Sequence, residues 1–391
     1  MAPPAIYLDN AATTPVLPEV REAMLPFLSA EGFGNPSSPH GVGRAARAAV
    51  EQARRQVAAA VGAEPPWVYF TSGGTEADNL AVLGGALAAR AAGRPVAVAH
   101  SSLEHKAVHA AAHAVEILGG SVTELRVDPD GVVDVDALDE ALASGAYLAA
   151  VMWVNNETGV VQHVRTMAER CVDTGAWLVS DAVQALGKMP CSIADLPRTI
   201  LALSAHKIGG PKGVGALILP DPHVVHPLIR GGGQQGGIRP GTENVPGIVG
   251  FGVAAERAAN GLAGHAAHLA TLRDGFERGV RVAFPDAVIH ATNAARAPHI
   301  SSIALPGTDS EAMLMHLDLA GICCSSGSAC TTGAVTPSHV LTAMGVPHDL
   351  AVATVRFSFG VQNTMADVER VLDTLPRVVG KVRDLRTALG R

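Results

Sequence analysis

Lysine and cysteine are both scarce in this sequence of 391 residues. Any reaction that needs a lysine amine has a short set of candidates, namely Lys106, Lys188, Lys207, Lys212 and Lys381. The cysteines are odd in number and follow neither a disulfide framework nor a Cys-x-x-Cys spacing, and they are Cys171, Cys191, Cys323, Cys324 and Cys330. This pattern favours free thiols in a reducing compartment.

Long apolar runs and strong charge are missing as well. No uncharged apolar run approaches the roughly 20 residues that a membrane helix needs. The opening residues contain neither a basic region nor an apolar signal segment. The formal charge of −7 is mild for this length and provides no basic surface for nucleic acid. We therefore expect a soluble, cytoplasmic protein that binds neither membranes nor nucleic acid directly.

Short apolar runs alternate with alanine-rich helical stretches through the first half of the chain. The first expected strand covers residues 67–71, and a helix follows it at about 75–91. Further strands are expected at 95–99, 122–127, 147–154, 177–181 and 200–204. The alternation predicts an α/β fold with a mostly parallel sheet, in which ligands bind beyond the carboxyl ends of the strands.

The pattern changes near residue 246. One long helical stretch is expected to run to about residue 282, before short strands at 300–305, 321–324 and 354–358. We expect a smaller α+β domain, formed by residues 1–15 together with 251–391, beside a large domain of residues 16–250. The extended segment 7–15 is too short to fold alone and is expected to pack on the smaller domain.

A run of small residues, Ser325 to Ala329, leads to the thiol of Cys330. Small residues give a mobile loop, and a thiol on such a loop is accessible for chemistry. A surface turn with an incidental cysteine is the alternative interpretation. With Cys323 and Cys324, the same thiol has no histidine partner at a zinc-like spacing, so no metal site is expected.

Lys207 follows an expected strand and precedes the turn Gly209-Gly210-Pro211. A lysine amine held at a strand end, away from water, can lose its proton and form a Schiff base. Lys212 is the main rival, and an ordinary surface lysine is the alternative. Ser204-x-x-Lys207 also matches a motif of serine β-lactamases, but the Ser-Asp-Asn and Lys-Thr-Gly motifs of those enzymes are absent.

Asp181 ends another expected strand, where a buried carboxylate needs a cationic partner such as a pyridinium nitrogen. A helix N-cap is the alternative role for Asp181. The turn at Gly74 and Thr75 joins a strand to a helix, and its free N–H groups suit a phosphate, to which Ser204 and His206 can donate. An ordinary strand–helix turn remains the alternative there.

His105 stands at the start of an expected helix and is suited to stack on a flat cofactor ring and to carry protons. A structural or exposed histidine is the alternative. Arg356 lies within an apolar strand, where a buried guanidinium favours a bidentate anion such as a substrate carboxylate. A structural salt bridge explains Arg356 equally well.

Taken together, the motifs resemble those of the cysteine desulfurases, the NifS/IscS-like branch of the class V aminotransferase family. The resemblance covers nearly the whole chain. Its motifs are residues 7–15, 34–38, 71–76, 104–108, 154–157, 181–184, 204–207, 239–242, 326–330 and 356–358. It implies fold type I of the enzymes that use pyridoxal 5′-phosphate (PLP), with a mostly parallel seven-stranded sheet.

The resemblance also implies a role for each matching residue. Lys207 is expected to carry the cofactor as a Schiff base, Asp181 to pair with the pyridine nitrogen, and His105 to stack on the ring. Gln184 is expected near the phenolic oxygen. The expected phosphate ligands are Gly74, Thr75, Ser204, His206 and, from a second subunit of a homodimer, Thr242. Asn156, Arg356 and Asn35 are expected to hold the substrate, with Asn156 also near the cofactor.

The implied reaction converts L-cysteine into L-alanine and leaves a persulfide on Cys330. The persulfide then passes to an acceptor protein, such as an iron–sulfur scaffold or a thiolation enzyme. Selenocysteine lyase or another aminotransferase-like activity is the alternative, and a scaffold without catalysis is a further one. The segment at Gln234 to Gly237 departs from the family, because the charged Glu-Arg that commonly follows the glycines is absent, and Pro240 replaces a small residue.

Overall fold

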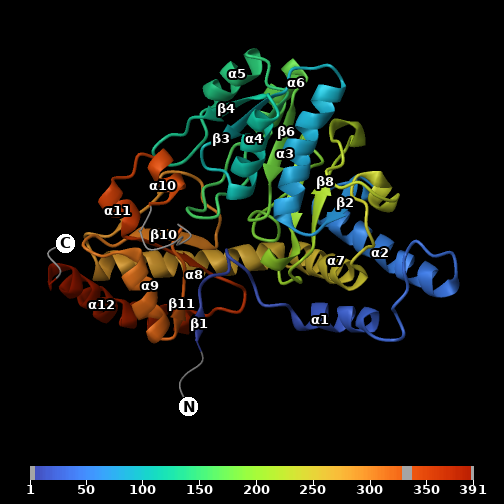
Figure 1. Cartoon of the computed structure of the whole chain (residues 1–391). Coiled ribbons are helices and arrows are strands. Elements are labelled where there is room, and N and C mark those ends of the chain that lie inside the picture. Colours follow the sequence, from blue (N-terminus) through green and yellow to red (C-terminus); the bar gives the residue numbers. More distant parts are fainter. Residues whose placement is uncertain (1–4, 328–336, 389–391) are drawn as a thin grey trace.

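The computed structural model describes residues 5–327 and 337–388, and a seven-stranded sheet forms its centre (Figure 1). The strand order is β2-β8-β7-β6-β5-β3-β4. The strands are β2 (Val68–Thr71), β3 (Ala97–Ser101), β4 (Ser121–Leu125), β5 (Leu148–Ala150), β6 (Trp177–Asp181), β7 (Thr199–Ser204) and β8 (Gly215–Ile218). In this sheet β8 runs opposite to the other strands, so its pairings with β2 and β7 are antiparallel and the other pairings are parallel. The predicted α/β class and mostly parallel sheet are confirmed.

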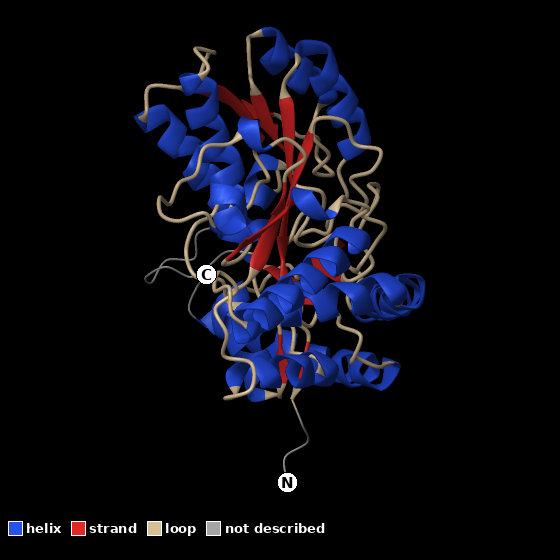
Figure 2. Cartoon of the chain, turned by 90° about the vertical axis from the view of Figure 1, so that its right-hand side faces the viewer, coloured by secondary structure: helices blue, strands red, loops and turns tan. Residues whose placement is uncertain are grey.

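Helices cover both faces of this sheet, as Figure 2 shows with the strands between two helical layers. One layer contains α3 (Gly74–Ala91) and α4 (Lys106–Ile117). The other contains α2 (Gly41–Ala60), α5 (Val135–Ala143), α6 (Val164–Thr174) and α7 (Val245–Asn260). Neighbouring residues of one strand pack into opposite layers, as Leu178 and Val179 do. This burial on both faces explains the continuous apolar strands.

A second core lies at the other end of the molecule. It combines the antiparallel sheet of β9 (Val288–Ile289), β10 (Ile300–Ala304) and β12 (Thr354–Ser358) with the parallel pair of β1 (Ile6–Tyr7) and β11 (Ile322–Cys323). The helices α8 (Leu262–Ala283), α9 (Ser310–Leu319) and α12 (Met365–Ala388) contribute buried side chains to this core. Phe276 on α8 packs on Phe357 of β12 with ring centroids 4.8 Å apart. The short helices are α1 (Pro18–Met24), α10 (His339–Ala343) and α11 (His348–Val352).

The long helix expected near residues 246–282 is in fact two helices. Gly261 separates α7 from α8, and it ends one helix and begins the other. Phe251 and Ala258 on α7 pack in the core of the large sheet, whereas Leu269 on α8 packs in the second core. The change of core therefore falls at this break. The domain boundary at residue 250 stays a prediction.

The first described residues connect the two cores. Ile6 and Leu8 are buried in the second core. The chain then crosses to the large sheet, where the Thr14 amide donates to His206 O at 2.9 Å and the Leu17 amide donates to Gly209 O at 2.9 Å. Ala11 and Ala12 are thereby placed beside the end of β7. Within the described part of the chain, no helix has the length and apolar character that crossing a membrane requires.

Candidate active site

A cavity of about 440 Å³ opens at the carboxyl ends of the parallel strands. Both cores contribute to its wall, because β6, β7 and α3 belong to the large sheet whereas β12 belongs to the second core. The predicted site residues that line it are Gly74, Thr75, His105, Asn156, Asp181, Gln184, Ser204, His206, Lys207 and Arg356. The cavity lies where open α/β sheets bind their ligands.

Lys207 ends the short turn that follows β7, and its amine faces the N-terminal segment. Nζ donates to the carbonyl oxygen of Ala12 at 2.7 Å and also to that of Ala11. Burial lowers the pKa of the amine to about 8, and the nearby positive charge of Arg356 acts in the same direction. Carbonyl oxygens accept a hydrogen bond without supplying a full negative charge. The amine is therefore far easier to deprotonate than an exposed lysine.

Asp181 is buried at the end of β6, and the Val183 amide donates to its Oδ1 at 2.9 Å. Burial raises the pKa of this carboxyl, while the charges of His105 and Lys207 oppose the rise. No arginine or lysine within the described residues forms an ion pair with Asp181. A buried acid that lacks a cation is in the environment that a pyridinium nitrogen would complete.

Two more buried acids stand near Asp181, and their importance was not predicted from the sequence. Burial raises the pKa of Glu104 to about 8, and it raises the pKa of Asp78 well above the usual range, with the charge of Asp181 adding to both effects. Glu104 accepts hydrogen bonds from Ser101 Oγ at 2.7 Å and from the Met152 amide at 2.8 Å. Asp78, Glu104 and Asp181 thus form a group of buried acids in which burial and mutual repulsion disfavour more than one negative charge.

His105 is the N-cap residue of α4, where its Nδ1 accepts a hydrogen bond from the Ala107 amide at 3.2 Å. Burial lowers the pKa of the ring. Because Nδ1 acts as an acceptor, the neutral ring carries its proton on Nε2. The Gln184 side chain is fixed as well, since its Nε2 donates to Ala11 O at 2.8 Å and its Oε1 lies 3.1 Å from His299 Nε2.

A second hollow continues outward past the N-terminus of α3. It shares Gly74, Thr75, Ser204 and His206 with the cavity and reaches Lys212, the rival lysine. Burial lowers the pKa of His206 to about 4, and its Nδ1 lies 3.1 Å from Thr13 Oγ1. The ring is therefore neutral near pH 7 and offers a hydrogen bond rather than a charge. A helix N-terminus with neutral donors suits a phosphate group.

Arg356 serves a structural salt bridge and lines the cavity at the same time. One guanidinium nitrogen donates to Asp9 Oδ1 at 2.7 Å, and another donates to the carbonyl oxygen of Asn156 at 2.9 Å. Asp9 lies within the motif at residues 7–15, but the sequence does not predict it as a partner of Arg356. Its place between an apolar residue and Asn10 in the opening segment is the only sequence signal for it.

The run of small residues before Cys330 is held against Arg356. Ser325 and Arg356 exchange two backbone hydrogen bonds, of 3.2 and 2.7 Å, and Ser325, Ser326 and Gly327 line the cavity. A Cβ atom on Gly327 would lie 1.8 Å from Glu157 Oε2, so a larger residue there would require the Glu157 side chain to move. Ser338 donates a hydrogen bond to the same Oε2. Gly327 and Ser338 thus both lie beside the Glu157 carboxylate, and Cys330 lies between them in the sequence, outside the described residues.

Asn35 and Thr242 do not line the cavity, and both are exposed in the single chain. The segment that carries Thr242 is nevertheless anchored beside the N-terminus of α3, because Arg239 pairs with Glu76 on that helix at 2.7 Å. The glutamines that depart from the family have structural partners. Gln235 is buried and accepts from the Phe70 amide at 2.9 Å, and Gln234 accepts from the Gly241 amide at 3.0 Å.

Comparison with known proteins agrees with this architecture. Residues 6–371 match the Aminotransferase class-V family. The chain is 47% identical to a cysteine desulfurase of Cereibacter sphaeroides, covering 97% of each chain, and 41% identical to the cysteine desulfurase IscS of Dictyoglomus turgidum, covering 97% of this chain and 96% of that one.

Solved structures give the same picture. A NifS-like protein superposes with a TM-score of 0.89 at 33% identity, covering 96% of this chain and 99% of that chain. DndA from Streptomyces lividans superposes with a TM-score of 0.76 at 37% identity, covering 90% and 99%. The chain therefore belongs to the class V aminotransferase family and, within it, to the cysteine desulfurases.

Proposed function

We propose that this desulfurase works with pyridoxal 5′-phosphate, receives the sulfur of L-cysteine on Cys330 as a persulfide, and passes it to an acceptor protein. One observation carries the proposal: a lysine amine of lowered pKa and a buried aspartate share a cavity with Arg356 and with the residues that lead to Cys330. The iron–sulfur scaffold and the thiolation enzyme remain the candidate acceptors.

The residues of the cavity fit the cofactor. Asp181 supplies the carboxylate for a pyridinium nitrogen, Lys207 supplies the amine for the aldehyde, and the N-terminus of α3 with Ser204 and His206 suits the phosphate. His105 and Gln184 are the proposed neighbours of the ring. When bound, PLP withdraws electrons from the substrate carbon atoms and so weakens the bond to sulfur.

Lys207 and His105 are proposed to move the protons. Near pH 7 the buried Lys207 amine exists partly without its proton, so Nζ can accept one from the substrate and return it. His105 holds a proton on Nε2 while the Ala107 amide fixes the ring through Nδ1. The lowered pKa of Lys207 and the fixed tautomer of His105 thus suit the two groups to proton transfer.

Arg356 and Asn156 are proposed to hold the substrate carboxylate, with Asn35 near them. The ion pair with Asp9 and the bond to the Asn156 carbonyl fix the guanidinium plane before substrate arrives. A preorganised guanidinium loses little freedom when it binds a carboxylate. The Asp9 carboxylate also offsets part of the positive charge that Arg356 brings to the cavity.

The sulfur step needs no outside oxidant or reductant. The Cys330 thiolate attacks the substrate sulfur, a sulfur–sulfur bond forms, and the carbon–sulfur bond breaks with its electrons going to carbon. Protonation of that carbon gives alanine, so one cysteine and one thiol become one alanine and one persulfide. The backbone pair of Ser325 with Arg356 and the hydrogen bond of Ser338 to Glu157 hold the residues on either side of the Cys330 segment.

The remaining parts of the proposal concern location. We propose a cytoplasmic enzyme, a compartment that agrees with the free thiols of Cys171, Cys191, Cys323 and Cys324. Fractionation of cells tests this placement, and recovery of the protein outside the cytoplasm would contradict it.

Replacing Cys330 by serine should abolish sulfide release while PLP binding persists, because a hydroxyl does not accept sulfane sulfur. Mass spectrometry of the wild type after a cysteine pulse should find one added sulfur on the Cys330 peptide. Cys323→Ser is the matched control, since burial raises the pKa of the neighbouring thiols and disfavours their reactive form. Added sulfur on Cys323 or Cys324 would disprove the assignment.

Replacing Arg356 by alanine should raise KM for cysteine far more than it weakens PLP binding. Losing a charge-assisted partner costs about 1.5–3 kcal/mol, which corresponds to about 13- to 160-fold in affinity. Asp9→Asn serves as the matched control, because it breaks the same ion pair and keeps the guanidinium. An Arg356→Ala variant that matches Asp9→Asn in KM would assign Arg356 a structural role.

We expect a homodimer in which Thr242 reaches the phosphate site of the other chain. The support is the exposure of Thr242 on a segment that Arg239 anchors at α3, and two-fold dimers are the commonest oligomers. Analytical ultracentrifugation should find a species of two 40.0 kDa chains. A single chain that retains full activity at high dilution is the contrary result.

A further inference from the structure

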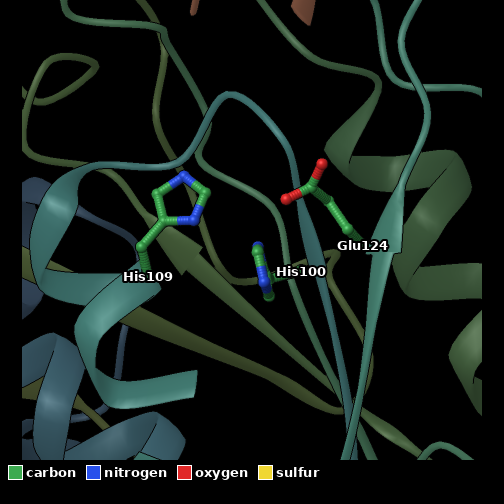
Figure 3. Close-up of side chains that lie close together, drawn as sticks. All are labelled: His100, His109 and Glu124. Carbon is green, nitrogen blue, oxygen red and sulfur yellow. The ribbon is translucent and has the colours of Figure 1, made fainter. Parts of the chain in front are cut away.

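Two histidines and a glutamate meet at the edge of the large sheet, apart from the cavity described above. His100 is on β3, His109 is in the first turns of α4, and Glu124 is on the neighbouring edge strand β4. Figure 3 shows the three side chains turned toward one common point. One ligand atom from each residue lies within 4.8 Å of the others. None of the three lines the cofactor cavity.

The hydrogen bonds around the two rings leave nitrogen lone pairs available. His100 is buried, and its Nδ1 lies 2.9 Å from the carbonyl oxygen of Ser101. A carbonyl oxygen only accepts, so Nδ1 carries the proton and Nε2 of the neutral ring keeps its lone pair. His109 Nε2 is buried and has no hydrogen-bond partner within the described residues. Buried polar atoms without a partner are rare and call for an unseen one.

We propose that His100, His109 and Glu124 form a binding site for a divalent transition-metal ion of the zinc type. Two imidazole nitrogens and one carboxylate oxygen are a known ligand set for zinc, with the fourth position left to water. The bond between His100 and the Ser101 carbonyl is the kind of outer contact that orients a metal-binding ring. Glu124 is exposed, so an ion can enter from solvent.

The three ligand atoms must move closer together to bind the ion. Ligand atoms around a tetrahedral zinc ion, with bonds of about 2.0–2.1 Å, stand about 3.3 Å apart. The exposed Glu124 side chain on an edge strand is free to supply most of this movement. The sequence offers no signal for the site, because residues 100, 109 and 124 follow none of the usual ligand spacings.

A bound ion would restrict the motion of His109, whose ring contacts a residue near the active site. The His109 ring packs on the ring of His339 at a centroid distance of 5.0 Å. His339 is the first residue of α10, and its Nε2 lies 3.0 Å from the backbone oxygen of Glu104, next to His105. The ion would therefore join β3, β4 and α4 at the point where α10 begins.

The test is zinc binding by the PLP-loaded full-length protein, purified without a histidine tag and treated with a chelator. Isothermal titration with Zn²⁺ should find one site per chain, and Mg²⁺ should not compete because it prefers oxygen ligands. His109→Gln and Glu124→Gln should each weaken binding at least about tenfold, judged by the losses seen even for outer contacts. His113→Gln is the matched control, since His113 is an exposed residue of the same helix that pairs with Glu116.

Thiols also bind zinc, so Cys330→Ser is measured in parallel. Unchanged binding in this variant keeps the site at the histidines, whereas lost binding assigns the ion to the thiol and overturns the proposal. Absence of binding by the wild type overturns it as well, and so does full affinity in Glu124→Gln. Because Glu124 is exposed, that variant tests the proposal even if the His109 variant fails to fold.

Discussion

The active site depends on keeping one carboxylate and one amine away from water without letting them neutralise each other. Asp181 is buried and Lys207 is partly buried, and each has neutral backbone hydrogen-bond partners in place of a direct ion pair. Burial shifts the pKa of each group toward its uncharged form. The cost of this arrangement falls when a cofactor supplies a cation to the acid and an aldehyde to the amine. Binding and reactivity therefore share one electrostatic origin.

The fold provides this arrangement through its connections. The parallel strands β6 and β7 place Asp181 and Lys207 at the same end of the sheet, beyond the carboxyl ends of the strands. The N-terminal segment leaves the second core, crosses to β7 and presents the Ala11 and Ala12 carbonyls to the amine. Arg356 comes from the second core and is fixed by Asp9 of the same segment. The proposed substrate contact, Arg356, and the proposed cofactor site thus meet at the junction of the two cores.

The sequence predicts those parts of the fold that are built from continuous apolar strands followed by polar residues. This pattern locates Asp181 at the end of β6 and Lys207 in the turn directly after β7. It does not predict β8, because that strand is short and begins at a glycine after a glycine-rich turn. Asp78 was missed because a polar residue within a helix is usually exposed, and only the packing of α3 buries it. Thr242 marks another limit, since its predicted partner belongs to a second chain.

The lowered pKa of the Lys207 amine is the central claim, and uptake of the cofactor by the apo-protein tests it most directly. The reactive form is the neutral amine, whose fraction rises with pH, from about a tenth at pH 7 if the pKa is about 8. Borohydride reduction shortly after mixing with PLP, followed by peptide mapping, measures the label on Lys207 at each pH. The account predicts that the initial rate of labelling rises to a midpoint near pH 8. Labelling of Lys212 instead, or a midpoint near the usual lysine value of about 10.4, would contradict it.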